Sequence, residues 1–294
     1  MKHPARHRAT LIGFTAVLLW ALLALFTVGS APVPPLQLNA MCFAIGGALG
    51  VGWLLATGGA ARLRAVPPRV YLFGTAGLFG YHALYFAALR LAPPAEAGLI
   101  AYLWPLLIVL FSGLLPGERL GAGHLMGALA GFAGAALIVG GGAGFESTAL
   151  PGYALAFACA LTWSGYSVIS RRLGAIPTES VVVFCLATAA LSVPLHLGFE
   201  ETVWPVSALG WAAVAGLGLG PVGLAFYVWD HGVKRGDIQL LGVASYAAPL
   251  LSTLVLVLTG FAEPTWRLGV AALLITGGAA LAARASFRAA DQAP

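Results

Sequence analysis

The sequence predicts an all-α polytopic membrane protein: ten transmembrane helices that form two inverted five-helix repeats around a central cavity. Of the 294 residues, 60% are hydrophobic and only 9% are charged, against roughly 25% charged residues in an average soluble protein. The chain also contains ten long apolar runs and a repeat that relates its two halves. A soluble enzyme, a secreted protein and a disordered chain are excluded, because so few charged side chains cannot cover a water-facing surface.

Each apolar run has about the 20 residues that a helix needs to cross the hydrocarbon core of a bilayer. The start of the first run, with basic residues before it and small residues near Gly29, would also suit a secretory signal peptide. Its apolar stretch from Leu11 to Val28 is longer than the core of a typical signal, which favours a span. The expected spans cover approximately residues 10–29, 36–56, 70–91, 95–115, 122–142, 150–170, 179–198, 207–230, 237–259 and 266–284.

The distribution of basic residues predicts the orientation of these spans. If the first span starts in the cytoplasm, 13 of the 15 Lys and Arg residues lie in cytoplasmic segments, and only Arg90 and Arg267 lie on the other side. Cytoplasmic segments carry most of the basic residues in membrane proteins. We therefore expect a multi-pass protein of the inner (plasma) membrane with both termini in the cytoplasm.

The net charge of +5 does not indicate nucleic acid as a partner. Nucleic-acid binding requires basic residues that cluster on one face or along one helix, and here they are scattered between apolar runs. The three cysteines, Cys42, Cys159 and Cys185, lie inside apolar runs without the spacing of a metal site. They are expected to be packing residues, and no metal or cofactor is expected.

The two halves of the chain resemble each other at an offset of about 144 residues. Residues 1–145 and 146–294 are expected to hold five spans each, so the second half enters the membrane from the opposite side. Many secondary transporters are built this way, with the substrate near the midplane between the repeats. Ten spans with an internal repeat suffice for a functional monomer. The matching residues include Pro105-Leu106-Leu107 with Pro249-Leu250-Leu251, Trp20 with Trp163, and Glu118 with Glu263.

The duplication, the tryptophan in the first span of each half and the pattern Pro105…Gly117-Glu118 resemble the drug/metabolite transporter superfamily, EamA type. This resemblance covers essentially the whole chain. Within that family, the aromatic residues of the third, fourth, eighth and ninth spans resemble those of the YddG-type exporters of aromatic amino acids. The resemblance implies export of small amphipathic metabolites, aromatic and other neutral amino acids above all, by alternating access.

Aromatic residues in the middle of the spans are the candidates for substrate binding. A tyrosine at depth needs a partner for its hydroxyl, and a water-filled cavity supplies one. Aromatic residues near the ends of spans are more often interfacial anchors, which is the expectation for Trp211, Trp229 and Trp266. The predicted substrate-binding set is Trp20, Tyr81, His82, Tyr85, Tyr102, Trp163, Tyr166, Tyr227 and Tyr246.

The mechanism of energy coupling depends on His82, the ionisable residue nearest the middle of a span. It is either a neutral imidazole bonded to a carbonyl group, or a cavity residue that titrates, since the ordinary pKa of histidine is about 6.5. Glu96 and Asp230 are expected near the interfaces, where water can reach them. Without a carboxylate at the midplane, facilitated transport is the simpler interpretation, and a proton-coupled multidrug or metabolite antiporter is the alternative.

Pro105 and Pro249 interrupt the fourth and ninth spans at equivalent points. Each removes a backbone hydrogen bond and tends to kink its helix. They are candidates for a pair of hinges, although a fixed bend would also explain them.

Motifs for catalysis are missing from the sequence, which contains no P-loop, no G-x-S-x-G and no H-E-x-x-H. We therefore do not expect an enzyme. No basic residue falls clearly at mid-depth, which favours a neutral or zwitterionic substrate over a nucleotide sugar. A membrane scaffold or receptor that transports nothing is the alternative from a different class.

Overall fold

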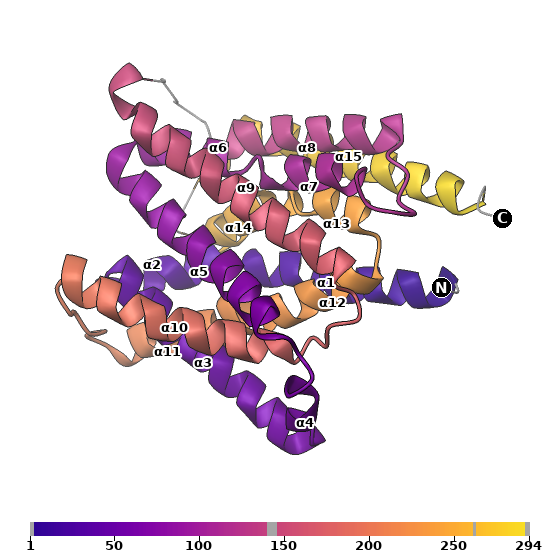
Figure 1. Ribbon diagram of the computed structural model, residues 1–294. Helices are drawn as coiled ribbons and strands as arrows, with labels where there is room; N and C mark the ends of the chain where they lie inside the picture. Colours follow the sequence, from indigo (N-terminus) through magenta and orange to yellow (C-terminus); the bar gives the residue numbers. More distant parts are fainter. Residues whose placement is uncertain (1–2, 140–145, 261–262, 292–294) are drawn as a thin grey trace.

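The computed structural model describes residues 3–139, 146–260 and 263–291, and the regular elements within these residues are all helices (Figure 1). Over the same residues, nine helical stretches are long and apolar enough to cross a membrane, and a shorter apolar stretch covers Glu96–Ser112. This confirms the predicted all-α polytopic fold. The predicted end of the fifth span at residue 142 and the last residue of the predicted first half, residue 145, lie outside the described residues.

The first half builds its five spans from α1 with α2, from α3, from α5, from α6 with α7, and from α8. The short helix α4 lies in the connection between the second and third spans. The bounds are α1 (His3–Trp20), α2 (Leu23–Gly29), α3 (Pro35–Thr57), α4 (Ala60–Leu63), α5 (Pro68–Leu91), α6 (Pro94–Ala101), α7 (Trp104–Ser112) and α8 (Ala122–Val139).

The second half begins with a short 3₁₀ helix and builds its spans from α9, from α10, from α11 with α12, from α13 with α14, and from α15. A π-helical turn joins α11 to α12. The bounds are Ser147–Ala149 for the 3₁₀ helix, α9 (Leu150–Arg172), α10 (Ser180–Phe199), α11 (Ala208–Leu219), Gly220–Leu224 for the π-helical turn, α12 (Ala225–Arg235), α13 (Ile238–Ala244), α14 (Ala247–Leu258) and α15 (Trp266–Asp291).

The fourth and ninth spans are each divided into two half-helices at equivalent points of the repeat. The break between α6 and α7 lies two residues before Pro105, and the break between α13 and α14 lies just before Pro249. Proline has no backbone N–H and cannot complete the hydrogen bond that would continue a helix through this point. Irregular backbone is tolerated at membrane depth only where protein or a water-filled cavity surrounds it. Both breaks therefore mark the interior of the bundle.

Local sequence signals explain where several helices begin and end. Proline occupies the first helical position of α3, α5 and α6, where its missing N–H is not needed. The buried carboxylate of Glu200 accepts hydrogen bonds from the backbone amides of Leu36 at 2.9 Å and Gln37 at 3.1 Å at the start of α3. A negative charge at this position complements the helix dipole. Gly58, with a φ of 65°, ends the same helix.

Both ends of the described chain lie at the same end of the bundle (Figure 1). We call this the terminus end; it carries Arg6, the C-terminal residues of α9 and the turn between α12 and α13. The other end, which carries the end of α5 and the start of α6, is called the opposite end. The placement of both ends together agrees with an even number of spans. Which side of the membrane the terminus end faces stays a prediction.

The fifth spans of the two halves, α8 and α15, pack directly against each other (Figure 1). Their backbones meet at two glycines, and a methyl group at Gly127 would lie 2.4 Å from the carbonyl oxygen of Gly278. Small residues permit such close approach between membrane helices. Gly278 begins the segment Gly278-Ala279-Ala280-Leu281, which repeats Gly134-Ala135-Ala136-Leu137 of the first half. This segment thus supplies part of the contact between the halves.

Candidate functional site

Four tryptophans from four different spans meet in the centre of the bundle. This tryptophan cluster consists of Trp20 on α1, Trp104 on α7, Trp163 on α9 and Trp229 on α12. Every pair of rings is in contact, with distances between ring centroids from 5.1 to 6.3 Å. Most of the pairs meet edge to face, the arrangement that the charge distribution of aromatic rings favours. Two spans of each half are thereby joined at one point.

Two of the four indole N–H groups of this cluster donate hydrogen bonds to other spans. The Nε1 atom of Trp20 donates to the carbonyl oxygen of Pro221 at 3.1 Å, and that of Trp229 donates to Oγ of Ser167 at 3.1 Å. Pro221 lies in the π-helical turn, a local irregularity often found at functional sites. Trp20 therefore links the first span of one half to the irregular point of the eighth span.

The prediction that Trp229 is an interfacial anchor is wrong. Its side chain is completely buried, because α12 continues to Arg235 and places Trp229 about 9 Å from the end of the helix, at 1.5 Å per residue. Trp211 and Trp266, which shared this prediction, are 47% and 72% exposed.

Partly exposed side chains of α5 extend from the tryptophan cluster toward the opposite end. The ring of Tyr81 lies 5.5 Å from that of Trp163 and stacks at 6.3 Å on the ring of Tyr85. The ring of His82 lies 5.0 Å from that of Phe43. Tyr81, His82 and Tyr85 together form an aromatic wall that is partly exposed, whereas three of the four tryptophans are buried.

The imidazole of His82 is held by its own helix. Its Nδ1 atom lies 2.7 Å from the carbonyl oxygen of Leu78. A carbonyl oxygen can only accept, so Nδ1 carries the hydrogen, and Nε2 is the nitrogen left to contact a substrate. This geometry agrees with an imidazole bonded to a carbonyl group and leaves the role of His82 in transport a prediction.

The remaining residues of the predicted binding set occupy three kinds of position. Tyr166 is buried and stacks on Trp163 at 5.2 Å. The hydroxyl of Tyr227 donates to the carbonyl oxygen of Gly46 at 3.0 Å, and the hydroxyl of Tyr246 accepts from the backbone amide of Leu106 at 3.0 Å. Tyr102, at the break between α6 and α7, is partly exposed.

The predicted set omits four aromatic residues that the structure places at the same centre. Two are the tryptophans Trp104 and Trp229, and two are Phe43 and Phe226, whose rings stack at 5.4 Å. The ring of Phe226 also lies 5.6 Å from that of Trp163. The sequence marks these residues only as aromatic positions within apolar runs, so their direction toward the interior could not be predicted without the packing of the helices.

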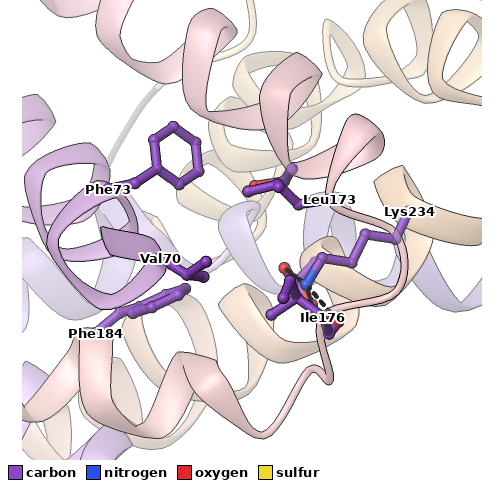
Figure 2. A pocket seen from close by; sticks show the side chains of 8 residues that line it. Val70, Phe73, Leu173, Ile176, Phe184 and Lys234 are labelled. Atoms are coloured by element: carbon purple, nitrogen blue, oxygen red, sulfur yellow. Dashed lines mark hydrogen bonds and ion pairs between the residues drawn. The ribbon is translucent and has the colours of Figure 1, made fainter. Parts of the chain in front are cut away.

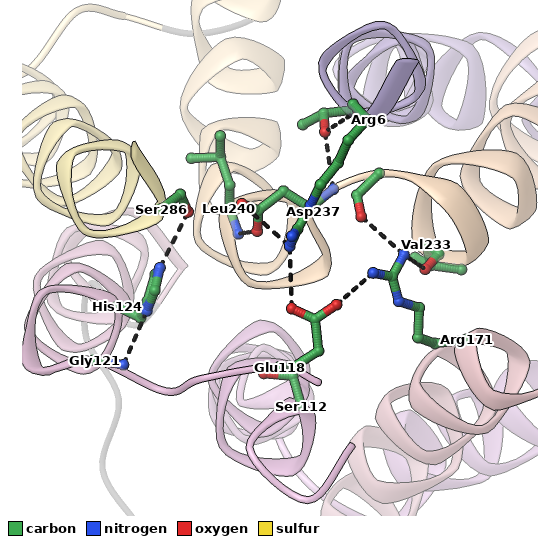
Figure 3. A network of polar contacts seen from close by, with 12 residues as sticks. Arg6, Ser112, Glu118, Gly121, His124, Arg171, Val233, Asp237, Leu240 and Ser286 are labelled. Atoms are coloured by element: carbon green, nitrogen blue, oxygen red, sulfur yellow. Dashed lines mark hydrogen bonds and ion pairs between the residues drawn. The ribbon is translucent and has the colours of Figure 1, made fainter. Parts of the chain in front are cut away.

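Charged residues close the terminus end of the bundle (Figure 3). Glu118 forms ion pairs with Arg6, at 3.0 Å between Nη2 and Oε2, and with Arg171. Arg6 also lies 3.7 Å from the carboxylate of Asp237, and Arg171 donates to the carbonyl oxygen of Gly236 at 2.8 Å. We call Arg6, Glu118, Arg171 and Asp237 the ion-pair latch. It ties α1, the segment after α7, the end of α9 and the turn before α13 together.

A second polar cluster near the terminus end contains Asp230. Its Oδ1 atom lies 2.8 Å from Nζ of Lys234, and its Oδ2 atom accepts from the hydroxyl of Thr178 at 2.7 Å. Lys234 also donates to the carbonyl oxygen of Ile176 at 3.1 Å. A cavity of about 10 Å³ lies beside this pair, with Val70, Phe73 and Phe184 on its other side (Figure 2), and holds one water molecule at most.

The expectation that water reaches Asp230 and Glu96 is wrong, because they are 1% and 4% exposed. For Asp230 the reason is the inward direction of α12, and for Glu96 it is the packing of α6 against α9. A buried charge must be paired, and the ammonium group of Lys234 serves this purpose for Asp230.

Comparisons with known proteins agree with this architecture. A profile of the EamA-like transporter family matches residues 7–140 and 150–284. The chain is similar to the aromatic amino acid exporter YddG of Ancylobacter novellus, with 58% identity over 95% of this chain and 98% of the relative. It is 27% identical to the aromatic amino acid exporter YddG of Escherichia coli over 94% of this chain and 97% of that protein. A crystal structure with 59% sequence identity matches with a TM-score of 0.90, covering 94% of this chain and 98% of that chain.

Proposed function

Because this chain belongs to the EamA-like transporter family, we propose that it exports aromatic amino acids, and other neutral amino acids, across the inner membrane. The chain is a multi-pass membrane transporter of small molecules and not an enzyme. The relatives named above are aromatic amino acid exporters. The tryptophan cluster with its aromatic wall is the observation in the structure that supports this substrate class.

The aromatic wall and the adjacent Trp163 can contact both the ring of an aromatic amino acid and its ammonium and carboxylate groups. The rings of Tyr81, Tyr85 and Trp163 offer faces and edges on which the substrate ring can stack, each contact contributing about 1 kcal/mol. The tyrosine hydroxyls and Nε2 of His82 can hydrogen-bond to its ammonium and carboxylate groups. The basic residues of the ion-pair latch lie instead at the terminus end, which favours a substrate without net charge.

Transport proceeds by alternating access between the two halves, residues 1–145 and 146–294, in a monomer whose termini are both cytoplasmic. The tyrosines bonded to backbone in this conformation, Tyr227 and Tyr246, stay in the proposed set, because the other conformation exposes different surfaces. Pro105 and Pro249 are the proposed hinges. The proposed substrate-binding residues are Trp20, Tyr81, His82, Tyr85, Tyr102, Trp163, Tyr166, Tyr227 and Tyr246.

Flux of labelled L-phenylalanine from proteoliposomes tests this function. The native protein should release it far faster than empty vesicles do. Trp163→Ala and Tyr85→Ala should each lower the flux at limiting substrate at least fivefold, because each removes a stacking contact of about 1 kcal/mol.

Trp211→Ala is the matched control, since this ring is 47% exposed on the outside of the bundle; it should transport like the native protein. Native protein that moves no aromatic amino acid would disprove the proposed substrate class. Normal flux in both site variants would place the binding site elsewhere.

Transport is proposed to be facilitative. Asp230, the buried carboxylate of the eighth span, is paired with Lys234. A carboxylate held in this way is not free to exchange a proton for substrate. The proton-coupled alternative therefore gains no support from the burial of Asp230, and the pH-gradient experiment in the Discussion decides between the two mechanisms.

A further inference from the structure

The break in the fourth span and the break in the ninth span are related by the repeat, residue by residue. An offset of 144 residues pairs Tyr102 with Tyr246 and Leu106 with Leu250, as it pairs Pro105 with Pro249. If the two halves were in the same conformation, each contact on one side would have its equivalent on the other. Differences between the two sides therefore report which conformation the structure represents.

The packing of the half-helices differs between the two ends of the bundle. At the terminus end, a methyl group at Gly242 on α13 would lie 3.2 Å from Cγ2 of Ile108 and 3.2 Å from the carbonyl oxygen of Pro105, both on α7. At the opposite end, a methyl group at the equivalent Gly98 on α6 would have only Val139 of α8 within 4 Å among the described residues. The half-helices are thus in close contact at the terminus end and apart at the opposite end.

Exposure of an equivalent pair of residues agrees with this difference. Ile108 on α7 is completely buried, whereas Ser252, its equivalent on α14, is partly exposed. The structure therefore represents a conformation closed at the terminus end and open at the opposite end.

The two equivalent tyrosines also differ. The hydroxyl of Tyr246 is completely buried and accepts the hydrogen bond from the amide of Leu106, in the first turn of α7. Amides in the first turn of a helix have no partner within the helix, so Tyr246 of one half caps a half-helix of the other. The equivalent bond, from the amide of Leu250 to the hydroxyl of Tyr102, is not formed in the described part of the chain, and Tyr102 is partly exposed.

We propose that Tyr246 and Tyr102 are positioning residues that alternate as caps during transport. Tyr246 caps α7 while the terminus end is closed, and Tyr102 caps α14 while the opposite end is closed. Each tyrosine releases its cap as its end opens. Each hydroxyl therefore stabilises one conformation and contributes nothing to the other. The inference rests on the proposed transport function only in assuming that both conformations occur.

The experiment measures labelling by a small water-soluble maleimide on the purified full-length protein in detergent, without substrate. Ser252→Cys reports opening of the opposite end, and Ile108→Cys reports opening of the terminus end. The native cysteines are buried, so the native protein gives the background. Loss of one neutral hydrogen bond should shift the ratio of the two labelling rates about fivefold.

Opposite shifts are expected for the two tyrosines. Tyr246→Phe should lower the ratio of Ser252→Cys labelling to Ile108→Cys labelling, and Tyr102→Phe should raise it. The variant with both changes should return close to the native ratio. Tyr153→Phe is the matched control, because its hydroxyl accepts from the amide of Glu146 within one half; it should leave the ratio unchanged.

Shifts in the same direction, or no shift for either tyrosine, would overturn the proposal, since a merely structural role gives no reason for opposite signs. The result is independent of the substrate. If the protein moves no phenylalanine but the two tyrosine variants still shift labelling in opposite directions, the proposed substrate is rejected and the proposal of alternating caps stands.

Discussion

At the scale of single residues, the interior of this protein combines large aromatic rings with polar partners for several of their N–H and O–H groups. Trp20, Trp229, Tyr227 and Tyr246 each bond to a backbone or hydroxyl group on another span. A buried polar group that lacks a partner costs about 1–3 kcal/mol. These bonds thus let large amphipathic rings fill the centre of a bundle whose outer surface faces lipid.

The indole N–H of Trp20 provides a test at this scale. Trp20→Phe keeps an aromatic ring in the cluster and leaves the carbonyl of Pro221 without its donor, which should lower the free energy of unfolding by about 1 kcal/mol. The measurement is thermal unfolding followed with a thiol-reactive fluorogenic dye, because the three cysteines are buried and react only after unfolding. Trp211→Phe, on the exposed surface, is the control. Equal loss of stability in both variants would show that the hydrogen bond contributes nothing.

At the scale of elements, the irregularities of the helices carry the functional information. The fourth and ninth spans break just before Pro105 and Pro249, where a helix lacks a donor. The eighth span contains a π-helical turn, and the third, its counterpart in the first half, is continuous. The two breaks therefore occur in both halves, whereas the π-helical turn occurs in one half only.

The ion-pair latch is not repeated at Glu263, the residue of the second half that corresponds to Glu118. Glu118 pairs with Arg6 and Arg171, while its repeat equivalent Glu263 is exposed. Glu118→Gln should lose a charge-assisted interaction of about 1.5–3 kcal/mol and favour opening of the terminus end. Labelling of Ile108→Cys should then become at least tenfold faster. Glu263→Gln is the control and should change nothing; an equal effect of both variants would refute a latch confined to one end.

At the scale of the whole molecule, the two halves form an inverted pair caught in an asymmetric arrangement, closed at the terminus end. The latch and the Tyr246 cap both stabilise this closure. A transporter of this construction changes state by exchanging the conformations of its halves. The residues that differ between the halves then decide which state is more populated at rest.

Energy coupling is a property of this whole cycle. In proteoliposomes, a facilitator carries L-phenylalanine down its own gradient at similar rates with and without an imposed pH difference, and this is the expected result. Accumulation against the phenylalanine gradient, driven by protons, would contradict it. Should that occur, His82→Gln identifies the carrier, and loss of accumulation assigns the proton to His82. Retention directs attention to Glu96 and Asp230, and for Asp230 the pairing with Lys234 would then have to break.

Sequence reasoning alone determined the medium and the ten spans, because hydropathy over about 20 residues is a local property that the bilayer enforces. Matching residues indicated the repeat, and the resemblance of its motifs indicated the transporter family. It also selected Trp20, Tyr81, His82 and Trp163 as mid-span candidates, and the structure brings their rings together, while their role in substrate binding stays a prediction. The burial of several other residues could be learned only from the tertiary structure.

The tertiary structure alone decided which side of each helix faces inward and which conformation the repeat adopts. Trp229 and Asp230 were expected at an interface and are buried, because the length and direction of α12 follow from its packing. Tyr102 and Tyr246 occupy the same place in the repeat, but Tyr102 is partly exposed, whereas Tyr246 is buried and bonded to Leu106 of the other half. The tyrosine and the proline are shared by both breaks, so these residues alone could not predict which tyrosine is buried against the other half.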